Sequence, residues 1–209
     1  VQTINDSANF TNRSFGLENF NIKVNLATSS DISTLKYFSE GLFGRIERKL
    51  IQNVPFLNPK YMVQSSNDYK TNIKNIRDNC YYDGYWQSEK YFKPIETILK
   101  TELQYTAVLN DKNALLLTDI INNESISVHI RRGDYLSIKV NGKLFAVCSD
   151  DYYKQAINYF LNKNDKSIFY IFSDDVDWAK SNFNGDSYLI VDNNANNPEI
   201  DLYLMSNCK

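Results

Sequence analysis

The sequence predicts an α/β fold in which helices cover the faces of a parallel sheet. After residue 125, short apolar runs alternate with segments of helical periodicity, and this alternation is typical of parallel sheets. The expected order is strand 126–130, helix 150–162, strand 167–172, a short helix around Trp178, strand 188–191 and helix 199–208. The polar segment 122–124 precedes the alternation, so we expect a boundary there between an N-terminal domain (residues 1–124) and a C-terminal domain (residues 125–209).

The N-terminal domain is expected to be largely helical. Residues 1–14 are polar and should form a loop, and apolar alternation predicts a strand over residues 18–27. Apolar residues then recur every three or four positions over residues 31–54 and again over 88–109, which predicts helices in both segments. The candidate short strands between them are residues 61–64 and 80–82.

Composition argues against several classes of protein. The 209 residues are 43% hydrophobic and carry a net charge of −2, which disfavours a nucleic-acid binder that relies on a broad basic surface. No apolar run approaches the roughly 20 residues that a membrane-spanning helix needs, and no signal peptide is visible. The three cysteines show no CxxC spacing and the chain has one histidine, so neither a disulfide framework nor a zinc site is indicated. The absence of GxGxxG and Walker A strings disfavours NAD and P-loop ATP binding.

Segment 126–135 carries the strongest functional signal. An apolar strand ends abruptly in Arg131, Arg132, Gly133 and Asp134. Arginine presents a planar fork of donors that matches phosphate oxygens, and open α/β sheets bind ligands beyond the carboxyl ends of their strands. The segment therefore predicts a diphosphate site, with a surface Arg–Asp ion pair in a turn as the alternative.

Acidic residues follow the next strands at the same expected edge of the sheet. Asp174 and Asp175 come directly after Ser173, where strand 167–172 breaks, and Asp201 opens the last helix. Cationic groups for a diphosphate beside acids for hydroxyl and base N–H groups describe a nucleotide site. The alternative for each acid is a structural role at the start of the helix that follows it.

Five short segments carry a likeness to a known family. They are Gly84-Tyr85-Trp86-Gln87-Ser88-Glu89-Lys90-Tyr91-Phe92, His129-x-Arg131-Arg132-Gly133-Asp134-Tyr135, Cys148-Ser149-x-x-Tyr152-Tyr153, Phe172-Ser173-Asp174-Asp175 and Asp201-Leu202-Tyr203-Leu204-Met205-Ser206-x-Cys208-Lys209. In this order they resemble the bacterial α-1,2-fucosyltransferases, which transfer fucose from GDP-fucose; residues 1–79 resemble that family only loosely. Its members begin with a Gly-Gly-x-Gly-Asn-Gln loop and continue past the Cys-Lys step, so we expect this chain to be an internal fragment.

The resemblance implies a GT-B-like arrangement, with two Rossmann-like domains that face a cleft. It implies inverting transfer of L-fucose from GDP-fucose to the 2-hydroxyl of a terminal galactose. The C-terminal domain would bind GDP-fucose and the N-terminal domain would lie on the acceptor side. Neither a metal nor another cofactor is expected, because an arginine would stabilise the charge that a metal stabilises elsewhere.

The resemblance also suggests roles for single residues. Arg131 would grip the β-phosphate and stabilise the departing GDP, and Asp201 would accept two N–H groups of guanine. Arg132 would orient the loop through ion pairs, with Asp134 as a partner. Asp134 is also the candidate base for the acceptor hydroxyl, only because it lies in this loop.

Two further groups of residues complete the expected site. The additional GDP-fucose contacts are expected from His129, Ser173, Asp174 and Asp175. The acceptor side is expected to include Tyr85, Trp86 and Gln87, with packing between the two halves as the alternative for this aromatic pair.

The expected partners are GDP-fucose and a galactose-terminated, lipid-linked oligosaccharide of O-antigen or capsule biosynthesis. Such acceptors imply a cytoplasmic protein at the inner face of the membrane. One alternative is a fucosyl- or other GDP-sugar transferase of different linkage. Another is a module that displays Arg132-Gly133-Asp134 to an adhesion receptor, which would require this loop to protrude, whereas a phosphate-binding loop must lie in a cleft.

Overall fold

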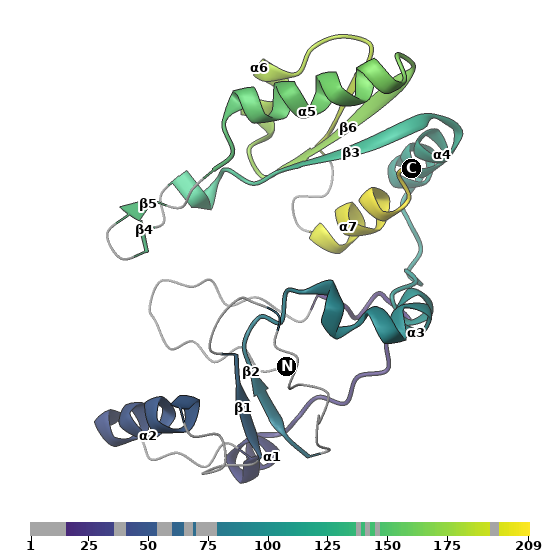
Figure 1. Ribbon diagram of the computed structural model, residues 1–209. Coiled ribbons are helices and arrows are strands. Elements are labelled where there is room, and N and C mark those ends of the chain that lie inside the picture. The colour runs from purple at the N-terminus through teal and green to yellow at the C-terminus, as the bar shows by residue number, and fades with distance from the viewer. Residues whose placement is uncertain are drawn as a thin grey trace. The chain divides into compact units, whose positions relative to one another are not determined.

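The chain divides into two compact units, Val1–Gln104 and Tyr105–Lys209 (Figure 1). The computed structural model describes residues 16–35, 41–53, 60–64, 69, 79–136, 139–140, 143–144, 147–192 and 197–209. The division falls before helix α4 (Asp111–Asn122), which the sequence analysis had placed in the domain of residues 1–124. Helix α4 lies in the second unit because Leu116 and Ile120 pack against the sheet of that unit.

The first unit contains a small parallel sheet and several short helices. Its elements are α1 (Ser29–Leu35), α2 (Gly41–Asn53), β1 (Tyr61–Val63), β2 (Tyr81–Asp83), the 3-10 helices η3 (Glu89–Tyr91) and η4 (Lys93–Ile95), and α3 (Glu96–Glu102). Strands β1 and β2 pair in parallel. The helices expected over residues 31–54 are confirmed by α1 and α2. Within residues 88–109 the helical structure is divided among η3, η4 and α3 and ends at Glu102, so the expectation is wrong for residues 103–109.

The strand expected over residues 18–27 is wrong. Phe20 makes an isolated bridge, and residues 22–28 run outside the sheets that the structure describes. Val24 and Leu26 are 40% and 61% exposed, so the apolar alternation does not bury one face. An alternating pattern becomes a strand only where a neighbouring strand satisfies its amides and covers its apolar side.

A three-stranded parallel sheet, in the order β3-β6-β7, forms the centre of the second unit. Its strands are β3 (Glu124–Ile130), β6 (Ser167–Ser173) and β7 (Tyr188–Val191), close to the expected bounds. The helices beyond α4 are α5 (Asp150–Lys163), α6 (Val176–Asn182) and α7 (Pro198–Ser206). After β3 the chain forms the 3-10 helix η5 (Asp134–Leu136) and an antiparallel pair, β4 (Lys139–Val140) and β5 (Lys143–Leu144), which the sequence had not indicated.

Side-chain caps determine where three of these helices begin. Asn110 precedes α4, Ser149 precedes α5 and Asp175 precedes α6, and each accepts a hydrogen bond from an amide in the first helical turn. Pro198 begins α7, where its missing amide hydrogen costs nothing. No described helix has the length and apolar character needed to cross a bilayer.

Helices cover both faces of the three-stranded sheet (Figure 1). Along β6, Tyr170 and Phe172 pack with α4 and α7, whereas Phe169 and Ile171 pack with α5 and α6. All four side chains are buried, and the Tyr170 hydroxyl donates to Asp119 Oδ2 of α4 at 2.8 Å. The expected α/β fold, with a parallel sheet flanked by helices, is therefore confirmed, and β6 is its central strand.

Candidate functional site

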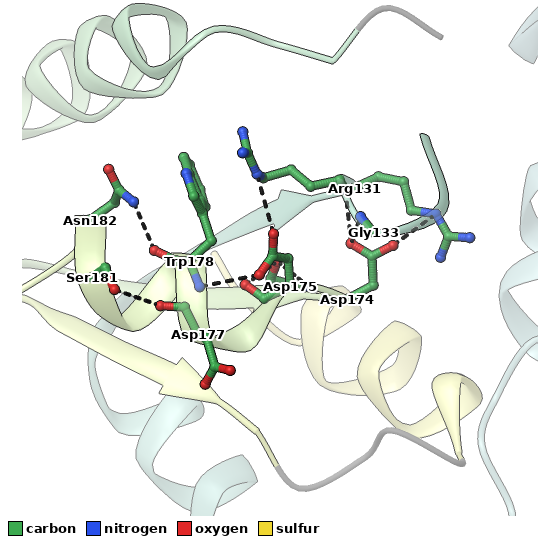
Figure 2. A network of polar contacts seen from close by, with 10 residues as sticks. Arg131, Gly133, Asp174, Asp175, Asp177, Trp178, Ser181 and Asn182 are labelled. Atoms are coloured by element: carbon green, nitrogen blue, oxygen red, sulfur yellow. Dashed lines mark hydrogen bonds and ion pairs between the residues drawn. The ribbon is translucent and has the colours of Figure 1, made fainter. Parts of the chain in front are cut away.

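The register of the sheet brings two predicted segments together. Ile130 of β3 lies opposite Ser173 of β6, so the residues that follow each strand leave the sheet side by side. These residues are Arg131, Arg132 and Gly133 from β3, and Asp174 and Asp175 from β6. The carboxyl edge of the sheet thus carries a cluster of two guanidinium groups and two carboxylates (Figure 2).

Asp174 holds the arginine loop in place. One oxygen of its carboxylate accepts hydrogen bonds from the backbone amides of Arg132 (2.8 Å) and Gly133 (3.2 Å). The other oxygen lies 3.2 Å from Nε of Arg131, which Figure 2 shows reaching over to this carboxylate. A Cβ at position 133 would lie 3.0 Å from the same oxygen, so a larger residue would displace the carboxylate. Asp174 therefore fixes both the path of the loop and the position of Arg131.

Arg132 points to the other side and is more enclosed than Arg131. Its side chain is 17% exposed, and its guanidinium carbon lies 4.1 Å from the centroid of the Trp178 ring, which is a cation–π contact. Nε of Arg132 lies 3.5 Å from Asp175 Oδ2 but makes no hydrogen bond, so the attraction there is an ion pair. Asp175 also caps α6 by accepting the Trp178 amide at 3.2 Å. Arg132, Asp175 and Trp178 therefore link the loop to the start of α6.

Helix α5 packs against this link through Tyr153. The ring of Tyr153 packs edge-on against Trp178, with a centroid separation of 6.2 Å. Burial, followed by the neighbouring Cys148, raises the pKa of the Tyr153 phenol, and Arg132 acts in the opposite direction. The Cys148–Tyr153 segment, which the sequence analysis noted without a role, therefore lies against the arginine loop.

The structure places several of the predicted residues at this edge of the sheet. Ser173, Asp174 and Asp175 do lie beside the two arginines, as the sequence predicted. Asp175 also caps α6, which is the structural role that the sequence analysis gave as the alternative, and its contact with the nucleotide stays a prediction. Arg132 forms an ion pair with Asp175. The side chain of Asp134, the expected partner, lies outside the part of the chain that the structure describes, so that pairing stays a prediction.

His129 lies near the carboxyl edge of the sheet, and Asp201 lies on a helix whose first turn is directed to that edge. His129 is an exposed residue of β3, opposite Phe172. Asp201 lies in the first turn of α7 and is partly buried. The amide of Lys209, just after α7, donates to the carbonyl of Ser125 near the start of β3, so the other end of α7 is directed to the carboxyl edge of the sheet.

Sequence reasoning missed Trp178 as part of this site. Trp178 is the third residue of α6, and its amide binds the cap, Asp175. The sequence did contain a signal for it: Asp175, a cap residue just after a strand, is followed three positions later by the aromatic Trp178. Tyr135, whose ring centroid lies 5.5 Å from the guanidinium carbon of Arg131, was noted only as part of the motif.

The adhesion interpretation is not favoured by this geometry. An adhesion loop must display its arginine, whereas Arg132 is 17% exposed and lies between Asp175 and the Trp178 ring. A surface ion pair in a turn also does not describe two arginines that are held by two consecutive acids of a neighbouring strand end.

Asp175 and Asp177 form an Asp-x-Asp string, a spacing that can hold a divalent ion, and the sequence analysis overlooked it. In the structure Asp175 is engaged with α6 and Arg132, and the carboxylate of Asp177 points away from it (Figure 2). Among the described residues, no group of three or more His, Cys, Asp or Glu side chains is placed to hold a metal ion. Independence from metal remains a prediction that only an activity measurement can test.

The aromatic segment of the first unit forms a separate feature. Oε1 of Gln64 accepts the amides of Tyr85 (2.8 Å) and Trp86 (2.9 Å). Gly84 has a φ of 151°, and Trp86 has a φ of 52°, which is unusual for a non-glycine residue. The Trp86 ring packs edge-on against Tyr82 and Tyr91, with centroids 5.9 and 5.5 Å away.

These contacts separate the roles of the three predicted acceptor-side residues. Trp86 is partly buried among other aromatic rings, as the packing alternative expected, although within its own unit. Tyr85 is 79% exposed and Gln87 is also exposed, so both are open to a ligand.

Comparison with known proteins identifies the family of the chain. The model of the family described as glycosyl transferase family 11 matches residues 35–209. An alpha-1,2-colitosyltransferase of Escherichia coli is 33% identical over 69% of this chain and 51% of its own length. The O-antigen biosynthesis glycosyltransferase WbnK of Escherichia coli is 28% identical over 95% of this chain and 70% of its own length. The human galactoside alpha-(1,2)-fucosyltransferase 1 is 29% identical over 40% of this chain and 24% of its own length.

The chain thus spans about half the length of the colitosyltransferase that it matches. No solved structure matches the chain.

Proposed function

Because the chain belongs to glycosyl transferase family 11, we propose that its parent protein transfers L-fucose from GDP-fucose to the 2-hydroxyl of a terminal galactose on a glycan, with inversion. The names of three relatives support this proposal, since two are called alpha-1,2-transferases of a deoxy sugar and one an O-antigen glycosyltransferase. The observation that carries it is the cluster of Arg131, Arg132, Asp174 and Asp175 at the carboxyl edge of the sheet.

The proposed chemistry follows from the position of Arg131. The galactose hydroxyl attacks C1 of fucose, the bond from C1 to the β-phosphate oxygen breaks, and GDP leaves with the electron pair. Negative charge therefore grows on the diphosphate, and a preorganised guanidinium stabilises it. Arg131 is the more exposed of the two arginines, at 31%, and Asp174 already holds it in position. We assign to Arg132 the role of fixing the loop, because it is enclosed by Trp178 and Asp175.

The remaining assignments are also proposals. His129 and Ser173 would line the donor site beside the loop, Asp201 would bind guanine from the first turn of α7, and Asp134 would accept the proton of the acceptor hydroxyl. The acceptor would contact Tyr85 and Gln87, which are exposed, more than Trp86. Two Rossmann-like domains facing a cleft, as in GT-B transferases, would bring these groups together. A lipid-linked acceptor would place the protein on the cytoplasmic side of a membrane.

A second donor is favoured by one specific observation, the name of the colitosyltransferase relative. Colitose is L-fucose without the 3-hydroxyl group, so the two donors differ by one hydrogen-bonding group. A site that hydrogen-bonds this hydroxyl rejects the deoxy analogue strongly, whereas a site that leaves it in solvent does not.

The proposal is tested by a transfer assay with the full-length protein. GDP-fucose or GDP-colitose is supplied with a β-galactoside acceptor, and the product linkage and anomeric configuration are determined by NMR. We expect an α-1,2-linked product and a higher kcat/KM for GDP-fucose. A faster reaction with GDP-colitose would reassign the donor, and transfer from neither donor would refute the proposed activity.

A further inference from the structure

Helix α2 carries an apolar stripe that faces outward. Leu42 and Phe43 are each 75% exposed, and Ile46 and Leu50 are each 52% exposed. At 100° per residue these four side chains fall within an arc of about 100° on the helix. Single exposed apolar residues are common, but four on one face of one helix form a continuous patch.

The side of the helix away from the stripe is covered at one described position. Among the residues of α2 whose burial is described, only Gly44 is buried, and it lies roughly opposite the centre of the stripe. No described helix or strand packs extensively against α2, which Figure 1 shows at the edge of its unit. The stripe is therefore left uncovered by the described part of the chain.

Charge identifies the kind of surface that would cover this stripe. Helix α2 contains three basic residues, Arg45, Arg48 and Lys49, and one acid, Glu47, in a chain whose net charge is −2. Arg45 and Lys49 lie one turn apart, on the flank next to Leu42. A helix with an apolar face and a basic flank is suited to lie in the plane of an anionic membrane surface, with its long basic side chains reaching the headgroups.

We propose that α2 docks the protein on a bilayer containing anionic lipid, with Leu42, Phe43, Ile46 and Leu50 entering the boundary between headgroups and acyl chains. The proposal goes beyond the proposed activity and does not depend on it. Antiparallel pairing of two copies through this stripe would bring the two basic flanks towards one another, which like-charge repulsion disfavours.

The test is co-sedimentation of the intact protein with phosphatidylcholine vesicles that contain either no phosphatidylglycerol or 30 mol%, roughly the charge of an anionic leaflet. We expect binding to the anionic vesicles that weakens in high salt. Phe43→Ser combined with Leu50→Ser should reduce the partition coefficient at least about 10-fold. Arg45→Gln combined with Lys49→Gln should reduce it roughly 25-fold, since each basic residue at an anionic surface contributes roughly five-fold.

Matched controls distinguish a lipid surface from the other partners that could cover the stripe. Val108→Ser with Leu115→Ser removes two apolar side chains that are 96% and 72% exposed elsewhere, and should leave binding unchanged. A Phe43→Trp variant read in a Trp86→Phe and Trp178→Phe background should show a blue-shifted emission on anionic vesicles. The proposal would be overturned if the wild-type protein bound neither type of vesicle. In that case, loss of a dimer in the Phe43→Ser, Leu50→Ser variant would assign the stripe to a second copy. A lower melting temperature of the same variant would assign it to another segment of this chain.

Discussion

Replacement of Asp174 distinguishes a residue that positions the arginine loop from one that contacts the nucleotide. In the structure the carboxylate of Asp174 accepts the amides of Arg132 and Gly133 and pairs with Arg131. Asp174→Asn retains an oxygen for both amides but loses the charge that faces Arg131. Asp174→Ala loses all three interactions.

The expected magnitudes follow from these contacts. A hydrogen bond to a charged group contributes about 1.5–3 kcal/mol, but the side chain of Asp174 is 25% exposed, so water replaces part of each bond. We expect Asp174→Ala to cost about 2 kcal/mol of the free energy that holds the loop, which corresponds to a roughly 30-fold loss of GDP affinity. Asp174→Asn should cost about 1 kcal/mol or less, a loss of roughly five-fold or less.

The assay is isothermal titration of GDP into the wild type and both variants, with Asp165→Ala, an exposed acid in the turn before β6, as the control. Urea unfolding of each variant verifies that the fold is retained. Equal losses of GDP affinity in the Asn and Ala variants would refute the positioning role and favour direct contact with the nucleotide.

Four further predictions rest on the same structure. Arg131→Lys keeps the charge but loses the donor fork, so turnover should fall about 100-fold, or roughly 3 kcal/mol, whereas Arg132→Lys should be milder; near-normal rates for both would exclude the assigned role. Activity of the full-length enzyme should survive EDTA, and inactivation that manganese or magnesium reverses would contradict the metal-free mechanism. Asp201→Asn should weaken GDP binding roughly 30-fold, by about 2 kcal/mol, and inosine diphosphate should bind the wild type more weakly than GDP; an unchanged GDP affinity would reduce Asp201 to a helix-terminal acid. Tyr170→Phe removes the hydrogen bond to Asp119, so unfolding in urea should show a loss of about 1 kcal/mol with GDP binding intact, and unchanged stability would mean that this bond contributes nothing.

The three strands of the parallel sheet and helices α5, α6 and α7 could be predicted because their signals are local. The apolar run of β6 ends at two acids, and both its faces are buried, so the sequence shows a continuous hydrophobic segment. Ser149 and Asp175 are conventional caps that lie directly before the helices they begin.

The parts that could not be predicted depend on pairing between distant residues. The register that sets Ile130 opposite Ser173 decides which acid faces which arginine, and it depends on pairing between two strands that are distant in sequence. The ion pair of Arg132 with Asp175, at the end of the neighbouring strand, could not be expected from proximity in sequence. Helix α4 likewise joins the second unit through contacts of Leu116 and Ile120 with the sheet, and these partners are distant from it in sequence.

A sequence motif predicts which residues form the site, but it does not separate residues that contact a ligand from residues that hold the loop in place. Arg131, Arg132 and Asp174 are close together, as the motif implied, yet their environments differ. The stacking of Arg132 on Trp178 is a contact between a loop and a helix that begins after another strand, so it could be found only in three dimensions.

The most direct test of the central claim is whether the carboxyl edge of the sheet is a GDP-sugar site. Calorimetric titration of the full-length protein with GDP-fucose, GDP, GDP-mannose and ADP-ribose answers this in one series. We expect GDP and GDP-fucose to bind to the wild type, Arg131→Lys to weaken both, and ADP-ribose not to bind. Equal binding of ADP-ribose, or GDP binding that Arg131→Lys leaves unchanged, would contradict the account.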